Sequence, residues 1–446
     1  MPKRSIWTLF QSAATLLLGF PVIKNNRKIQ MALSIDILRL PNFRLLVMAR
    51  MFGHMALQAM AVIVGWQIYS LTKSEFLLGL IGLTEAIPAI LSAFFSGYVV
   101  DISTPQRVYM YCVAMLVLNM GAMLILGGGY TSLSHDHLVP MLFVGVFISG
   151  IARSFMMPSY FSLTPQIIER KDYSSASAWS NTAVQIAVMT GPVLAGLTYG
   201  FAGAHAAWIL PVTFMSLAFL CIINIKNIRL YDKIQAGQPA MKNIIEGWKF
   251  IITHRMLLTI MTVDMFAVLF GGAVAMLPAY ASEVLHVGPE GLGLLRTAPA
   301  FGAILAALYF AVRPMQTFPL VRMLWTVGAF GVCMIGFGLS TSFMLSILFL
   351  AASGLFDTIS VVIRTTLKQI LTPDNMRGRV SAISSMFVIS SNEIGAFESG
   401  TAARLMGLVP SVVFGGAMTL MIVTMTYILT PNLRKKIIDD NTPIPS

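Results

Sequence analysis

The chain has 446 residues, of which 57% are hydrophobic and only 11% are charged. Soluble globular domains carry about 25% charged residues, so the composition excludes a water-soluble protein and predicts that lipid surrounds much of the chain. The net charge of +12 would suit a nucleic-acid-binding protein, but the positions of the charges, described below, argue against one.

Residues 1–40 form an N-terminal segment that we expect in the cytoplasm. An apolar run over 6–20 lies between basic residues, as in the hydrophobic core of a signal peptide. No small-x-small cleavage site follows this run. Two interpretations remain open: a helix that lies at the membrane interface, or translation that begins at Met31.

Twelve apolar stretches follow, each close to the roughly 20 residues that cross the hydrocarbon core of a bilayer. The first six are predicted at 45–70, 76–100, 108–128, 139–163, 175–199 and 204–225. The second six are predicted at 257–282, 291–312, 317–339, 341–363, 380–403 and 408–430. We therefore expect an all-α integral membrane protein with two pseudo-symmetric six-helix bundles. The predicted parts after the N-terminal segment are bundle 41–225, cytoplasmic linker 226–256, bundle 257–431 and cytoplasmic tail 432–446.

The distribution of Lys and Arg predicts the orientation, because these residues stay preferentially on the cytoplasmic side. Most of the 30 lie in the termini, the linker and the loops on the same side as the linker. The opposite loops hold only Lys73 and Arg404, and Arg50, Arg153 and Arg296 lie within or at the edge of spans. Both termini are therefore expected on the cytoplasmic side of an inner membrane. The net positive charge is then explained by membrane topology and not by nucleic-acid binding.

Two loops resemble each other at equivalent places in the two bundles. Gln166-Ile167-Ile168 precedes a Ser-Ala run after the fourth span, and Gln369-Ile370-Leu371 precedes Ser381-Ala382 after the tenth. This favours an internal duplication with a substrate path between the halves, although short amphipathic loops also look alike by chance. In the linker, apolar residues over 241–252 recur at helical spacing and predict an amphipathic helix on the inner leaflet that tethers the halves.

The second span ends with Gly97-Tyr98-Val99-Val100-Asp101, and Arg107 follows. This segment resembles the loop G-x-L-A-D-R-x-G-R-R between helices two and three of the major facilitator superfamily. The resemblance implies a gating loop of Gly97, Asp101 and Arg107. The family's arginine and glycine are replaced by Ile102 and Thr104, so only Asp101 retains the acidic part of the gating charge network.

Other segments are similar to the enterobactin-exporter-like and drug-exporter branch of this superfamily. They are Trp66–Thr72, Ala152–Phe155 with Pro158, Gly191-Pro192, Leu277-Pro278 and Gly291–Leu295. The resemblance implies the major facilitator fold and proton-coupled export of a small organic molecule, such as a siderophore or a drug. The family's first helix often carries an acidic residue where Leu57 stands, so no proton site is implied there.

Ionisable side chains inside spans are the candidates for a substrate path or a proton-coupling site. An ionised group at the bilayer centre costs about 2.5–3.5 kcal/mol, so it needs a partner or a water-filled cavity. The candidates are Glu85, Arg153, Asp264, Asp357, Glu393, Glu398 and His54. A structural ion pair is the alternative for each of them. Desolvation favours the neutral form of a carboxyl group, so such a group can bind a proton outside and release it inside, whereas Arg153 would pair with a carboxylate or an anionic substrate.

The remaining motifs narrow the class of protein. Gly191-Pro192 predicts a bend in the fifth span. No phosphate-binding loop is present, and the three cysteines lie far apart, so we expect no nucleotide, cofactor, metal or disulfide. The leading hypothesis is a monomeric exporter that lies in the lipid bilayer and uses protons to transport a small molecule out of the cell. An importer or exchanger of a metabolite, and an integral membrane enzyme or assembly partner that uses Glu85, His54 and Arg153, remain alternatives.

Overall fold

The computed structural model describes residues 35–130, 134–169, 172–226, 240–312, 320–373 and 376–431, and its regular structure within these ranges is entirely helical. The first half contains η1 (Ile35–Arg39), α3 (Pro41–Thr72), α4 (Glu75–Ile102), α5 (Pro105–Gly127), α6 (His135–Ile167) and α7 (Tyr173–Ile223), and the linker contains α8 (Ala240–Thr253). The second half contains α9 (Arg255–Phe270), η3 (Ala273–Met276), α10 (Leu277–Ala279), η4 (Tyr280–Val284), α11 (Pro289–Val312), α12 (Leu320–Leu339), α13 (Phe343–Leu371), α14 (Arg377–Met406) and α15 (Leu408–Leu429). The expectations for the apolar run over 6–20 and for the tail 432–446 lie outside the described residues.

The number of membrane spans depends on one glycine. Eleven helices of the described ranges are long and apolar enough to cross a membrane. Among them, α7 has 51 residues, and a helix of that length extends about 75 Å, more than twice the hydrocarbon thickness. Gly203, with φ of 79° and ψ of 179°, divides α7 into two spans, a conformation that the absence of a Cβ atom allows. With α7 counted twice, the twelve predicted spans are confirmed.

The seventh span, predicted at 257–282, is not one regular helix. α9 ends at Phe270, and the short elements η3, α10 and η4 continue the span to Val284. Pro278 lies in this irregular part and cannot donate a backbone hydrogen bond. The Tyr280 hydroxyl donates to the carbonyl of Gly338 on α12. The irregular backbone is thus packed inside protein, as backbone at membrane depth requires.

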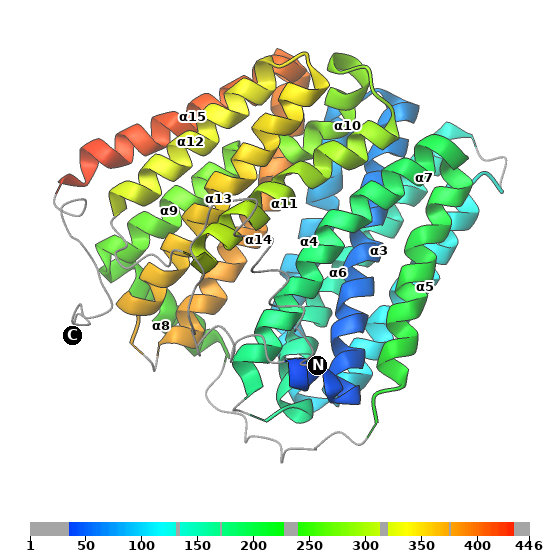
Figure 1. Cartoon of the computed structure of the whole chain (residues 1–446), viewed down its shortest axis with the longest axis horizontal. Coiled ribbons are helices and arrows are strands. Elements are labelled where there is room, and N and C mark those ends of the chain that lie inside the picture. Colours follow the sequence, from blue (N-terminus) through cyan, green and yellow to red (C-terminus); the bar gives the residue numbers. More distant parts are fainter. Residues whose placement is uncertain are drawn as a thin grey trace, which may run out of the picture.

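Two bundles lie side by side in Figure 1, with α3–α7 forming one and α9–α15 the other. In the first bundle α3 packs on α7 and α4 on α6, and in the second α11 and α12 pack on α13. The bundles meet where α4 lies against α14 and where α7 lies against α11. In span numbers, the second span packs against the eleventh, and the fifth packs against the eighth. If the second six helices repeat the first six, these two contacts are equivalent.

The bundles approach closely at the end of the molecule that carries Lys73. A Cβ atom built at Gly400 of α14 would lie only 2.7 Å from the Cα atom of Gly79 on α4, so the contact requires glycine. At the same end, the Lys73 Nζ atom lies 3.4 Å from the Glu283 Oε1 atom and joins α3 to η4. This ion pair is exposed, so we expect it to contribute little energy on its own. The glycine contact therefore brings α4 and α14 into close approach at this end.

The linker helix belongs to the second bundle. α8 packs on α14 and α9, which agrees with the helix predicted over 241–252. Glu246 of α8 forms an ion pair with Arg379 of α14, and the ring of Trp248 lies 5.2 Å from the ring of Phe387, centroid to centroid. Because α8 is anchored on one bundle, it would move with that bundle if the two halves rock against each other.

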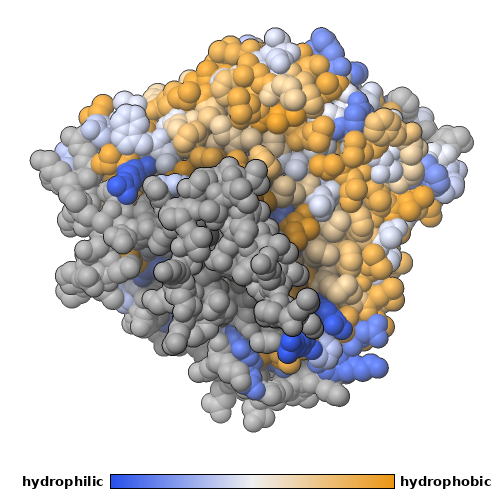
Figure 2. All heavy atoms as spheres, viewed as in Figure 1, coloured by the Kyte–Doolittle hydropathy of each residue, from blue (hydrophilic) through white to orange (hydrophobic). Residues whose placement is uncertain are grey.

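The outer surface is suited to lipid. Figure 2 shows that the described surface is mostly hydrophobic and that strongly hydrophilic side chains lie mainly near its rims. Large apolar side chains are exposed on several helices, among them Leu118 on α5, Phe201 on α7 and Met344 on α13. Exposed apolar area on this scale indicates a surface that contacts membrane rather than water.

Candidate functional site

A cavity of about 490 Å³ lies between the two bundles. It is lined by α3, α4 and α6 of the first bundle and by α9, α11, α12, α13 and α14 of the second. Its ionisable lining residues are His54, Glu85, Arg153, Asp264, Arg296, Asp357, Arg364 and Glu393. Ligand pockets in proteins are typically 300–1,000 Å³, so the cavity can hold a small organic molecule.

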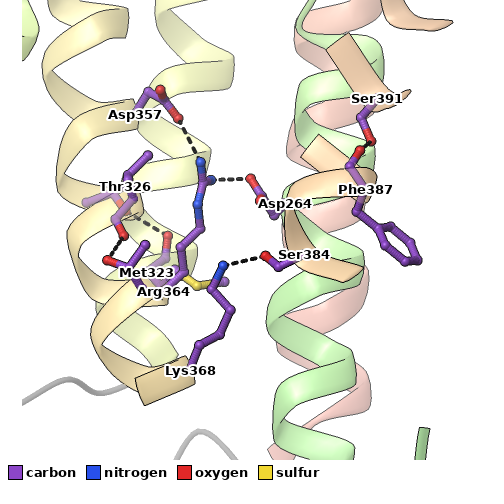
Figure 3. A network of polar contacts seen from close by, with 11 residues as sticks. Asp264, Met323, Thr326, Asp357, Arg364, Lys368, Ser384, Phe387 and Ser391 are labelled. Atoms are coloured by element: carbon purple, nitrogen blue, oxygen red, sulfur yellow. Dashed lines mark hydrogen bonds and ion pairs between the residues drawn. The ribbon is translucent and has the colours of Figure 1, made fainter. Parts of the chain in front are cut away.

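Asp264, Arg364 and Asp357 form one charged group in the second bundle (Figure 3). The Arg364 guanidinium on α13 donates a hydrogen bond to Asp264 on α9, and its Nη2 atom lies 3.8 Å from the Asp357 Oδ1 atom. Asp264 and Arg364 are buried, whereas 47% of the Asp357 side chain is exposed. Two carboxylates therefore share one guanidinium, and the more loosely held carboxylate is the one that water reaches.

Two polar side chains surround this group of three residues. Lys368, one turn beyond Arg364 on α13, donates a hydrogen bond of 2.5 Å to the Ser384 Oγ atom and ties α13 to α14 (Figure 3). The hydroxyl of Ser360, between Asp357 and Arg364 on the same helix, lines the cavity and is buried without a hydrogen-bond partner among the described residues. A buried polar atom without a partner is costly, so Ser360 is available to a molecule in the cavity.

A second charged group joins the two bundles. Glu85 of α4 forms an ion pair with Arg153 of α6, whose side chain is 46% exposed. The carboxylate of Glu393 on α14 interacts electrostatically with Arg153 and with Arg296 of α11. A Cβ atom built at Gly82 would lie 3.3 Å from the Glu393 Oε2 atom, so this carboxylate of the second bundle reaches the surface of α4. The charges of the two bundles therefore meet around Glu393.

The structure brings six of the seven proposed path residues to one cavity: His54, Glu85, Arg153, Asp264, Asp357 and Glu393. His54 lies near the positive charges of Arg50 and Arg153. Glu398 is not among the cavity-lining residues, although it shares α14 with Glu393. It lies five residues further along, and five residues rotate a helix by about 140° relative to the cavity-facing position.

Among the other predicted residues, Arg107, Gly191 and Pro192 are not among the residues that line the cavity. Gly97 and Asp101 are in the last turns of α4, and their side chains lie outside the described part of the structure. Arg107 is exposed in the first turn of α5. The backbone of α7 remains helical through Gly191 and Pro192, and the non-helical residue inside this helix is Gly203. Pro192 instead contributes to the contact between bundles, because a Cβ atom at Gly293 would lie 2.6 Å from the Pro192 carbonyl oxygen.

Sequence reasoning missed two arginines of the site. Arg364 was assigned to a cytoplasmic loop because the tenth span was predicted to end at 363, but α13 continues to Leu371. The spacing of seven residues between Asp357 and Arg364 places them on one face of a helix, two turns apart, and would have indicated a pair. Arg296 was recognised only as an arginine at the edge of a span.

Comparisons with known proteins agree with this architecture. Residues 34–443 match a family described as transmembrane secretion effectors. The enterobactin exporter EntS of Citrobacter koseri is 23% identical over 401 residues, which cover 89% of this chain and 93% of that protein. EntS of Escherichia coli O1:K1 gives the same identity and coverage.

Solved structures of transporters are similar in fold. The nucleoside transporter NupG gives a TM-score of 0.68 at 10% identity, with 87% of this chain and 100% of that chain covered. A bacterial homologue of the iron transporter ferroportin in its inward-facing state gives a TM-score of 0.67 at 15% identity, with 90% and 100% covered. At such identities the similarity establishes the fold and does not identify a substrate.

Proposed function

The chain belongs to the transmembrane secretion effector family of the major facilitator superfamily, and from this membership we propose that it exports a small organic molecule across the inner membrane in exchange for protons. Family membership makes the chain a multi-pass secondary transporter and not an enzyme. It therefore removes the alternative of an integral membrane enzyme. Both termini are proposed to be cytoplasmic, as the distribution of Lys and Arg predicts.

The observation that carries the proposal is the cavity between the bundles, to which both bundles contribute ionisable groups. A binding site at the interface of two repeated bundles is what alternating access requires, because rocking of the bundles exposes the same site to each side in turn. Charged side chains are costly to insert into lipid, so they are rare in membrane helices except at sites of this kind. The closed contact at the Lys73 end would be the external gate, given the proposed orientation.

Asp357 is the carboxylate best placed to carry the proton. Asp264 and Asp357 share the Arg364 guanidinium, and Lys368, one turn further along α13, adds a second positive charge, so one proton on Asp357 would change the charge of this group by one unit. Asp264 is held directly by Arg364 and is buried, whereas Asp357 faces water in the cavity. A charge that crosses about 100 mV delivers about 2.3 kcal/mol. Proton entry through Asp357 could therefore drive export.

Export of a siderophore-like or drug-like molecule is proposed because the chain is similar to enterobactin exporters over most of its length. The experiment is untargeted mass spectrometry of medium and cell extracts from a strain lacking this protein and from its parent, both grown under iron limitation. We expect one metabolite to be depleted in the medium and accumulated in the cells, and expression of the intact chain to reverse both changes. Iron binding by that metabolite would support the siderophore class. Unchanged levels in both compartments would refute siderophore export.

A further inference from the structure

Arg296 of α11 is a cavity-lining guanidinium with no hydrogen bond or ion pair to any part of the chain that the structure describes. It is half-buried, and its neighbour Thr297 donates a hydrogen bond of 3.1 Å to the Met189 carbonyl oxygen on α7. Arg296 therefore lies where the two bundles meet. A guanidinium withdrawn from bulk water without an acceptor is energetically costly, and the described residues give Arg296 a charge interaction with Glu393 but no hydrogen-bond acceptor.

The surroundings of Arg296 indicate the charge of that partner. Its favourable charge interaction is with Glu393, which also interacts with Arg153 of the opposite bundle. Among the described residues Arg153 forms an ion pair with Glu85, and nearly half of its side chain remains exposed. Two guanidinium groups, one from each bundle, thus line the same cavity as the Glu393 carboxylate, which interacts with both through its charge. Guanidinium groups bind carboxylates and similar oxyanions through paired hydrogen bonds.

We propose that Arg296 and Arg153 form a binding site for the acidic group of an organic anion, and that Glu393 occupies this site electrostatically until the anion replaces it. This inference rests on the proposed function only in taking the cavity as the substrate site. An anion held by both arginines bridges the bundles, so its binding is coupled to their relative position. Outward movement of a negative charge is also favoured by an inside-negative membrane potential.

The test measures binding to the purified full-length protein in nanodiscs, using 1-naphthoate, 1-naphthamide and 1-naphthylmethylamine as probes. They share one aromatic ring system and differ in charge. Naphthoate is expected to bind by isothermal titration calorimetry, and the neutral and cationic probes to bind at least about tenfold more weakly, because a charge pair in a shielded site contributes strongly. Equal binding of the three probes, or tighter binding of the amine, would overturn the proposal.

Variants separate this site from a purely structural role. Arg296→Gln should weaken naphthoate binding at least about tenfold, Arg296→Lys should restore part of it, and Glu393→Gln should strengthen it because the competing carboxylate is removed. The exposed Arg322 on α12 provides the matched control Arg322→Gln, with unchanged binding expected. Unchanged binding in Arg296→Gln, or weaker binding in Glu393→Gln, would contradict the proposal. Binding needs no transport, so failure of export with naphthoate binding intact would count against the proposed function alone.

Discussion

Replacement of Asp357 by Asn is expected to abolish proton-driven accumulation of substrate while exchange of substrate across the membrane continues. The amide cannot bind and release the coupled proton, so a driving force equivalent to a concentration ratio of about 50 per charge at 100 mV is lost. Arg364 keeps its direct bond to Asp264 in this variant, so the fold should be retained. The measurement is transport into everted membrane vesicles with and without a proton gradient, alongside exchange of labelled for unlabelled substrate.

The control for this variant is Asp136→Asn, an equal chemical change at an exposed residue in the first turn of α6. It should transport like the parent protein in both assays. Parental accumulation in Asp357→Asn would exclude Asp357 as the proton carrier. If the variant loses both exchange and accumulation, the residue is needed instead for substrate binding or folding.

Replacement of Arg364 by Met is expected to destabilise the protein by about 3–5 kcal/mol, because removal of one partner leaves a buried charge without compensation. Asp264 is 6% exposed and loses its direct partner. Protonation of the orphaned carboxyl group would recover part of this cost. Thermal unfolding in detergent, followed by tryptophan fluorescence, should therefore show a melting temperature well below that of the parent protein.

A second change tests the origin of this effect. In the double variant Asp264→Asn with Arg364→Met, both members of the buried pair are neutral, so the melting temperature should recover towards that of the parent. Arg322→Met is the matched control, and a change within about 0.5 kcal/mol is expected at this exposed site. A double variant no more stable than Arg364→Met alone would show that the guanidinium acts through packing and not through its charge.

The fold was largely predictable because hydropathy determines where a chain can cross a bilayer. All twelve spans were located from apolar length, and Gly203 lies in the gap predicted between 175–199 and 204–225. The end of the tenth span was wrong because Arg364 and Lys368 have hydropathies typical of a loop. Both are satisfied inside the protein, by Asp264 and by Ser384, which a hydropathy scale cannot register.

The candidate site was predictable as a set of residue types and not as a geometry. The cost of placing charge in lipid identified six residues that line the cavity. Glu398 satisfies the same criterion but faces another direction on α14, which depends on how the helix is rotated. The approach of Glu393 to α4 is a contact between distant segments, and whether the chain supplies Arg296 with an acceptor depends on contacts of the same kind. The order of residue types along a single sequence contains no signal for such contacts.

The central claim is that this chain exports a small molecule through the cavity in exchange for protons. Its most direct test uses the purified protein in liposomes with an imposed pH gradient and the metabolite that the knockout strain retains. The account predicts accumulation that requires the gradient, disappears with a protonophore, and is accompanied by proton movement in the opposite direction. Accumulation that is the same without a gradient, or no transport by the folded protein, would contradict it.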